Sequence, residues 1–124
     1  MKYLLDVNAL LALKHSRSVH HQACRIWVSK QGFEAMATCA LTELSFIRVS
    51  MAAFGVSLAD AQKDLAELKS KIAGFVEKAP TPSLPAWSNH AAKTTDAYLV
   101  QLARSASLEL ATFDAGIPGA VIIK

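Results

Sequence analysis

Short apolar runs alternate with helical patterns along this chain of 124 residues. The runs predict strands over residues 2–5, 34–38, 75–78, 108–113 and 120–123. Between them, apolar residues recur every three or four positions, which predicts helices over 8–14, 19–31, 41–51, 57–73 and from 94 or 95 to 106. Strands separated by helices are typical of βαβ units. We therefore expect an α/β fold whose central parallel sheet has four to five strands and is covered on both faces.

Local signals place several of the boundaries. Ser57 is the expected N-cap of the helix that follows it, and Gly74 is its expected stop. Thr94 or Thr95 is expected to cap the last helix. Three prolines within residues 80–85 predict a loop. Of the whole chain, residues 80–93 are the segment whose local structure the sequence predicts least well.

Composition indicates one globular domain over residues 1–124, since 52% of residues are hydrophobic and 19% are charged. The net charge of +3 is compatible with a polyanionic partner but does not require one. Cys24 and Cys39 lack metal-binding spacing, so we expect two reduced, buried thiols. We expect no signal peptide, because Asp6 and Asn8 interrupt the apolar N-terminus, and no apolar stretch reaches the ~18–20 residues needed for a membrane span. We expect a cytoplasmic protein.

Four of the ten acidic residues occupy unusual positions. Asp6 and Asp114 directly follow predicted strands, at the edge of a parallel sheet where ligands bind. Glu43 and Asp96 lie near the starts of two predicted helices and share a face with apolar residues. The other six are expected to be solvated or structural: Glu34, Asp60, Asp64, Glu67, Glu77 and Glu109.

Convergence of these four acids would require a cation, because carboxylates are rarely buried unless they are paired or bind a metal. Oxygen ligands suit Mg²⁺ or Mn²⁺, and we expect the four carboxyl groups within about 4–8 Å of a common point. Each acid also has a simpler explanation. Asp6 could cap a helix, Asp96 could favour a helix N-terminus, and Asp114 could belong to a turn before Gly116.

Four segments resemble motifs of one family. Residues 4–13 (LLDVNALLAL) resemble the opening of PIN-domain proteins, and residues 37–49 (ATCALTELSFIRV) resemble the second motif of VapC-type toxins. Residues 95–103 (TDAYLVQLA) and 111–114 (ATFD) resemble the third and fourth motifs. The motifs occur in the family's order and span nearly the whole chain.

This resemblance implies a three-layer α/β/α PIN-like domain and a Mg²⁺- or Mn²⁺-dependent endoribonuclease that hydrolyses RNA with a metal-activated water. It also implies the toxin of a VapBC-type pair, which binds a VapB-type antitoxin and commonly forms a homodimer. By matching position, the catalytic acids would be Asp6, Glu43, Asp96 and Asp114, and all of them except Glu43 would be metal ligands. Asn8 and Thr112 match supporting polar positions.

Other residues have a functional and a structural interpretation. We expect His20 to pack, His21 to be exposed and Trp27 to belong to the core. Arg48 could contact an RNA phosphate or form a surface salt bridge. Trp87 could stack on a base or anchor an interface. Apolar residues of the first helices could serve the core or a dimer or antitoxin groove: Leu10, Leu11, Leu13, Ile26 and Val28.

Two other functions stay open at this point. A non-catalytic PIN-like module would bind RNA or protein without a metal, although none of the four acids is lost. An aspartyl-phosphate phosphatase would use Asp6 as its nucleophile. Such enzymes need a second aspartate two residues on, where this chain has Asn8.

Overall fold

The computed structural model describes residues 1–124 as one five-stranded sheet with helices on both faces. The strands are β1 (Tyr3–Leu5), β2 (Met36–Cys39), β3 (Gly74–Val76), β4 (Glu109–Thr112) and β5 (Val121–Ile122). The α-helices are α1 (Val7–Lys14), α2 (His21–Gln31), α3 (Ala40–Phe54), α4 (Leu58–Lys71) and α5 (Ala91–Ser105). Short 3₁₀ turns, η1 and η2, span Phe33–Ala35 and Ala86–Ser88.

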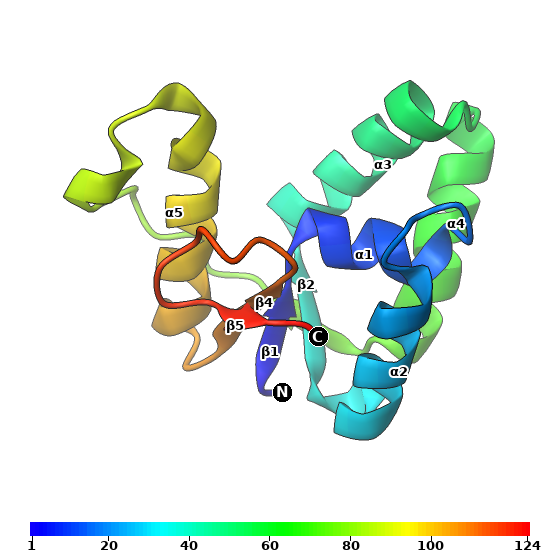
Figure 1. Ribbon diagram of the computed structural model, residues 1–124, viewed down its shortest axis with the longest axis horizontal. Coiled ribbons are helices and arrows are strands. Elements are labelled where there is room, and N and C mark those ends of the chain that lie inside the picture. The colour runs from blue at the N-terminus through cyan, green and yellow to red at the C-terminus, as the bar shows by residue number, and fades with distance from the viewer.

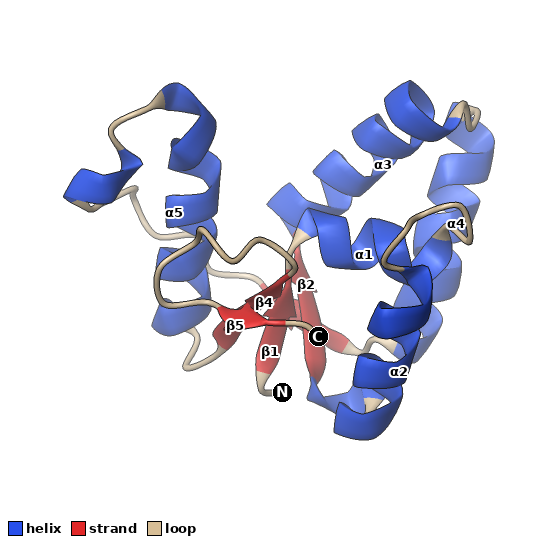
Figure 2. Ribbon diagram, viewed as in Figure 1, coloured by secondary structure: helices blue, strands red, loops and turns tan.

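The three layers are visible in Figure 1, where α5 lies on one side of the sheet and α1 to α4 lie on the other. Figure 2 shows the same layers by secondary structure. Alternation along β1 explains this arrangement: Tyr3 and Leu5 belong to the core cluster with α1 to α4, and Leu4 belongs to the cluster with α5. The prediction of a three-layer α/β/α fold is confirmed.

All neighbouring strands pair in parallel, in the order β3-β2-β1-β4-β5. The chain builds outward from β1 to β3 and then returns to place β4 on the other side of β1. The strand order therefore reverses between β1 and β4. In open α/β sheets, ligands bind at such a point, outside the carboxyl ends of the strands.

Three predicted helix boundaries are wrong, and the first is the end of α3, which is Phe54 rather than residue 51. Helix α4 has the predicted N-cap, since Ser57 Oγ accepts from the Asp60 N–H, but it ends at Lys71 rather than at Gly74. The reason is Ile72, which is 1% exposed and turns to an extended conformation as its side chain enters the core. Gly74 instead begins β3, which is an edge strand of the sheet.

Helix α5 begins at Ala91, before the predicted threonine caps, and its N-cap is His90. Thr94 lies inside the helix, where its hydroxyl donates to the Ala91 carbonyl. Asp96 is consequently in the second turn, and the first turn contains no acidic residue. A simple preference of Asp96 for a helix N-terminus does not account for its position, since that effect is confined to the first turn.

Most of the apolar residues of the first two helices lie in the core rather than on a surface where a second copy or an antitoxin could bind. Leu10, Leu11, Leu13 and Val28 are all core residues, and only Ile26 is exposed. These four residues therefore serve the core, and of them only Leu13 also lines a surface pocket.

The expected packing of His20 is confirmed, although its side chain is exposed, and the expected exposure of His21 is wrong. His20 is exposed at the N-cap of α2, where its ring stacks on Phe113 with centroids 4.3 Å apart. His21 is half-buried, and its Nδ1 lies 2.7 Å from the Ala12 carbonyl oxygen. Trp27 is half-buried against Tyr3 and the larger core, as predicted.

Both cysteines are free and buried, as the sequence predicted. Burial raises the pKa of the Cys24 thiol to about 12, which keeps it protonated and unreactive. None of the helices combines the length and apolar character required to cross a membrane.

Packing predicts a large difference between two leucine substitutions. Leu10 is 0% exposed in the larger core, so Leu10→Ala should lower the free energy of unfolding by about 2–5 kcal/mol. Leu44 is 65% exposed on α3, and Leu44→Ala should change it by less than about 0.5 kcal/mol. Urea denaturation followed by circular dichroism measures both, and equal losses would contradict this assignment of the core.

Candidate functional site

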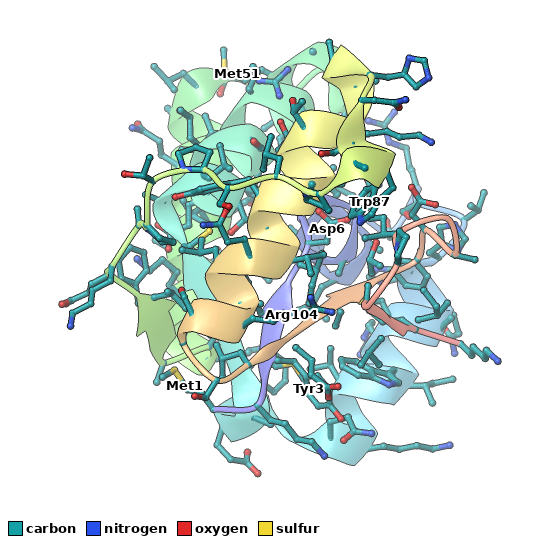
Figure 3. All side chains as sticks on the ribbon, turned by 90° about the vertical axis from the view of Figure 1, so that its left-hand side faces the viewer. Met1, Tyr3, Asp6, Met51, Trp87 and Arg104 are labelled. Carbon is teal, nitrogen blue, oxygen red and sulfur yellow. The ribbon has the colours of Figure 1, made fainter.

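Asp6 is the buried centre of the site, with an exposed fraction of 3% directly after β1. One carboxylate oxygen, Oδ1, accepts a hydrogen bond of 2.7 Å from the Val7 N–H at the start of α1. The other, Oδ2, accepts one of 2.8 Å from the Thr112 hydroxyl at the end of β4. Asp6 thus joins the carboxyl ends of the two central strands, and Figure 3 labels it beside α5 in that view.

A second hydrogen bond extends this connection to Asp114. The Asp114 N–H donates to Thr112 Oγ1 at 3.1 Å, and Asp114 Oδ1 accepts from the Gly116 N–H at 2.8 Å. Asp6 caps α1 and Asp114 forms a turn with Gly116, so both simpler structural interpretations are correct. These structural roles do not keep the two carboxylates from interacting, because the charge of Asp114 raises the pKa of Asp6.

Three carboxylates repel one another at this edge of the sheet. Burial raises the pKa of Asp6 most, the hydrogen bonds from Thr112 and Val7 oppose the rise, and the charge of Asp114 adds to it. The pKa of Asp96 is raised first by burial and then by the charges of Asp6 and Asp114. No lysine, arginine or histidine pairs with any of the three aspartates. The negative charge at this edge is therefore uncompensated by the protein.

Glu43, unlike the three aspartates, has a basic partner. Its carboxylate accepts a hydrogen bond of 2.6 Å from the Thr38 hydroxyl and pairs with Lys69 Nζ of α4 at 3.1 Å. Its charge is not among the causes that shift the pKa of Asp6 or Asp96. Glu43 is at the predicted end of the sheet, but it is neutralised by a lysine.

The expectation that four carboxyl groups surround one point is wrong for this conformation. No three His, Cys, Asp or Glu side chains are arranged to hold one ion together. Mg²⁺ nevertheless binds to many proteins through only one or two carboxylates and keeps several waters. The crowded, unpaired aspartates Asp6, Asp96 and Asp114 offer hard oxygen donors and excess negative charge, and they fit such a cation.

The remaining predicted residues divide into two groups. Thr112 is fully buried and supports Asp6, as expected. Asn8 is exposed and forms no side-chain hydrogen bond, and Arg48 is exposed and forms no ion pair. Neither the salt bridge considered for Arg48 nor a supporting contact from Asn8 is present.

Sequence reasoning missed Thr38 and Lys69. A signal existed for Thr38, because it is a polar residue near the end of a buried strand, as Thr112 is. No signal pointed to Lys69, which lies 26 residues from Glu43 and meets it only because α4 packs against α3.

Comparisons with known proteins support the geometry. Residues 3–120 match the PIN domain. Ribonuclease VapC38 of Mycobacterium tuberculosis (strain ATCC 25618 / H37Rv) is 37% identical over 123 residues, which cover 92% of this chain and 86% of that protein. Ribonuclease VapC29 of strain CDC 1551 / Oshkosh is 33% identical over 94% of this chain and 89% of its own length.

A solved structure shows the same architecture. The crystal structure of PAE2754 from Pyrobaculum aerophilum has a TM-score of 0.60 and 25% sequence identity, over 99% of this chain and 84% of that one. The match to the PIN domain, the VapC relatives and the all-parallel sheet agree with one another. This chain belongs to the PIN-domain family and is a VapC-type toxin.

Proposed function

We propose that this chain is a Mg²⁺- or Mn²⁺-dependent endoribonuclease and the toxin of a VapBC-type pair. The observation that carries the proposal is the buried Asp6 carboxylate, which the Thr112 hydroxyl ties to the end of β4 beside two further unpaired aspartates. The ribonuclease names of the relatives support the same reaction class.

Asp6, Asp96 and Asp114 would hold the cation in this proposal. When bound, the ion would supply positive charge to the phosphodiester and lower the pKa of an attacking water. Val7 and Thr112 fix both oxygens of Asp6, so this carboxylate cannot rotate away from its position. Glu43 would join the reaction after leaving Lys69, either by accepting a proton from water or by orienting it.

Protein partners are also part of the proposal. The VapC names of the relatives suggest a VapB-type antitoxin, and we propose a homodimer. Exposed apolar side chains on α3 and α4 support contacts with other proteins, among them Leu44, Met51 and Leu58. A ribonuclease toxin would act on RNA in the cytoplasm, where the free thiols of this chain would stay reduced.

Removal of the central charge should abolish activity. Asp6→Asn keeps the side-chain volume but removes the carboxylate, and RNA cleavage should fall by about a thousandfold or more, as for other residues that stabilise transition-state charge. Cleavage of a labelled RNA with Mg²⁺ present measures the loss, and circular dichroism verifies the fold. Asp60→Asn, on the exposed side of α4, should cleave normally. Full activity of the Asp6 variant would exclude the proposed site and favour a non-catalytic module.

The crowded charges predict an unusual pH dependence of stability. Because the pKa of Asp96 is raised above its ordinary value of 3.8, the folded chain binds more protons than the unfolded chain between the two pKa values. Stability therefore falls as pH rises through this window. In EDTA at pH 7, Asp96→Asn should raise the melting temperature, and the gain should vanish below pH 3.8.

Addition of Mg²⁺ at pH 7 should make the parent chain melt at a higher temperature than Asp96→Asn, because the cation compensates the charges in the parent chain. Calorimetry with and without Mg²⁺ tests the reversal, and Asp60→Asn serves as the control. If Asp96→Asn melts below the parent chain in EDTA at pH 7, the aspartates do not repel one another.

The ion pair between Lys69 and Glu43 should compete with the active arrangement. Lys69→Gln removes a positive charge from this edge of the sheet and releases Glu43, so the Mg²⁺ concentration for half-maximal cleavage should fall about twofold to fivefold, as expected for loss of one partly exposed ion pair. Lys63→Gln, exposed on the same helix and without an ion pair, is the matched control. An unchanged Mg²⁺ requirement would show that Lys69 does not restrain Glu43.

A further inference from the structure

A pocket of about 470 Å³ lies between α5, the segment from Ser83 to Trp87 and the loop that joins β4 to β5. Its walls include Leu84, Trp87, Val100, Arg104 and Gly119. None of the four acids discussed above lines it, and no acidic residue does. The pocket is therefore chemically different from the site around Asp6.

Hydrogen bonds hold one wall of this pocket in place. Gln101 of α5 donates from Nε2 to the Thr81 carbonyl at 2.9 Å and accepts from the Ser83 N–H at 2.9 Å. The Tyr98 hydroxyl of the same helix donates to the Pro80 carbonyl at 2.8 Å. Because the proline-rich segment is anchored to α5 at three points, the pocket is formed before a ligand arrives, which lowers the entropic cost of binding.

Arg104 gives the pocket its charge. It forms no ion pair and donates no hydrogen bond, although guanidinium groups bind phosphate oxygens well. Gly119 leaves the space for it, since a Cβ there would lie 2.3 Å from Arg104 Nη2. Gly119 also has φ +82°, a conformation that L side chains rarely adopt.

Trp87 supplies an aromatic surface a short distance away. It is half-buried in η2 and packs against the core cluster of α5, so its position is fixed. Figure 3, which looks onto α5, labels Trp87 and Arg104 on the two sides of Asp6 in that view. An aromatic side chain and an unpaired guanidinium in one pocket match a nucleotide, which offers a planar base and a phosphate.

The pocket and the acidic site share two structural elements. Ala97 lines the pocket and directly follows Asp96, and Val100 lies one helical turn after Asp96 on the same face. Pro118 and Gly119 belong to the β4–β5 loop, which also contains Asp114. A strand of RNA at the aspartates would therefore have a neighbouring nucleotide at the pocket.

We propose that this pocket binds one unpaired nucleotide of the RNA adjacent to the cleaved bond, with the base on Trp87 and a phosphate on Arg104. This inference rests on the proposed ribonuclease function and adds a residue pair that selects single-stranded substrate. Stacking on Trp87 accepts any base, whereas the pocket excludes a base that is paired in a duplex.

Tryptophan fluorescence tests occupancy directly. The chain contains two tryptophans, so Trp27→Phe leaves Trp87 as the only indole. In the Asp6→Asn background, a four-nucleotide single-stranded RNA and adenosine 5′-monophosphate should both quench Trp87, and ribose 5-phosphate, which lacks a base, should not. If the RNA binds without changing Trp87 emission, the pocket does not hold a base and the proposal is wrong.

Variants test the energetic role of each group. Trp87→Leu should weaken binding of the four-nucleotide RNA about tenfold to a hundredfold, and Trp87→Phe should recover most of it. In the cleaving enzyme, Trp87→Leu should raise KM with little change in kcat.

Arg104→Gln should reduce the slope of log Kd against log salt concentration by about 0.7, and Arg104→Lys should restore it. Arg25→Gln, exposed on α2 across the sheet, is the charge-matched control and should retain parental KM and kcat.

The outcomes separate this proposal from the ribonuclease assignment. If Trp87→Leu and Arg104→Gln bind RNA like the parent while Asp6→Asn abolishes cleavage, the pocket proposal is wrong and the ribonuclease stands. If Asp6→Asn cleaves fully, the ribonuclease assignment fails. If Trp87→Leu instead converts a dimer to a monomer in sedimentation, the pocket is an interface between copies, which also overturns the proposal.

Discussion

The hydrogen bond between the Thr112 hydroxyl and Asp6 Oδ2 is the interaction on which the site depends. It joins residues 106 positions apart and connects the ends of β1 and β4, where the strand order of the sheet reverses. A buried carboxylate is costly unless it is hydrogen-bonded, and Asp6 has one donor for each oxygen. Loss of either donor would leave the Asp6 carboxylate free to rotate or to take up a proton.

The structure compensates the acidic residues unevenly. Asp6, Asp96 and Asp114 have no basic partner, and burial, followed by the charge of neighbouring aspartates, raises the pKa of the first two. Glu43 is paired with Lys69 and bonded to Thr38. An excess of negative charge that the protein does not neutralise is expected where a cation binds, whereas a neutralised glutamate must exchange one partner for another. We regard this difference as the basis of the proposed order of events, in which Glu43 joins last.

Much of the fold and of the site follows from local pattern. Alternating strands and helices predicted the parallel sheet, and the position of Asp6 and Asp114 directly after strands predicted the edge at which they meet. Boundaries were less predictable. Gly74 has the residue type of a helix stop, but Ile72 leaves α4 earlier because burial of its side chain outweighs one more helical turn. The partial burial of His21 has a similar origin, since its Nδ1 lies against a carbonyl of α1 that is next to α2 only in the folded chain.

The sequence by itself determined the fold class and the four candidate acids, because strand ends and helix faces follow from the chemistry of neighbouring residues. The tertiary structure decided which charges are compensated. Lys69 reaches Glu43 only through the packing of α4 on α3, and Arg104 lies beside Gly119 of the β4–β5 loop, where no acidic side chain pairs with it. Electrostatic interactions depend on distance and burial rather than on sequence separation, and both are properties of the folded chain.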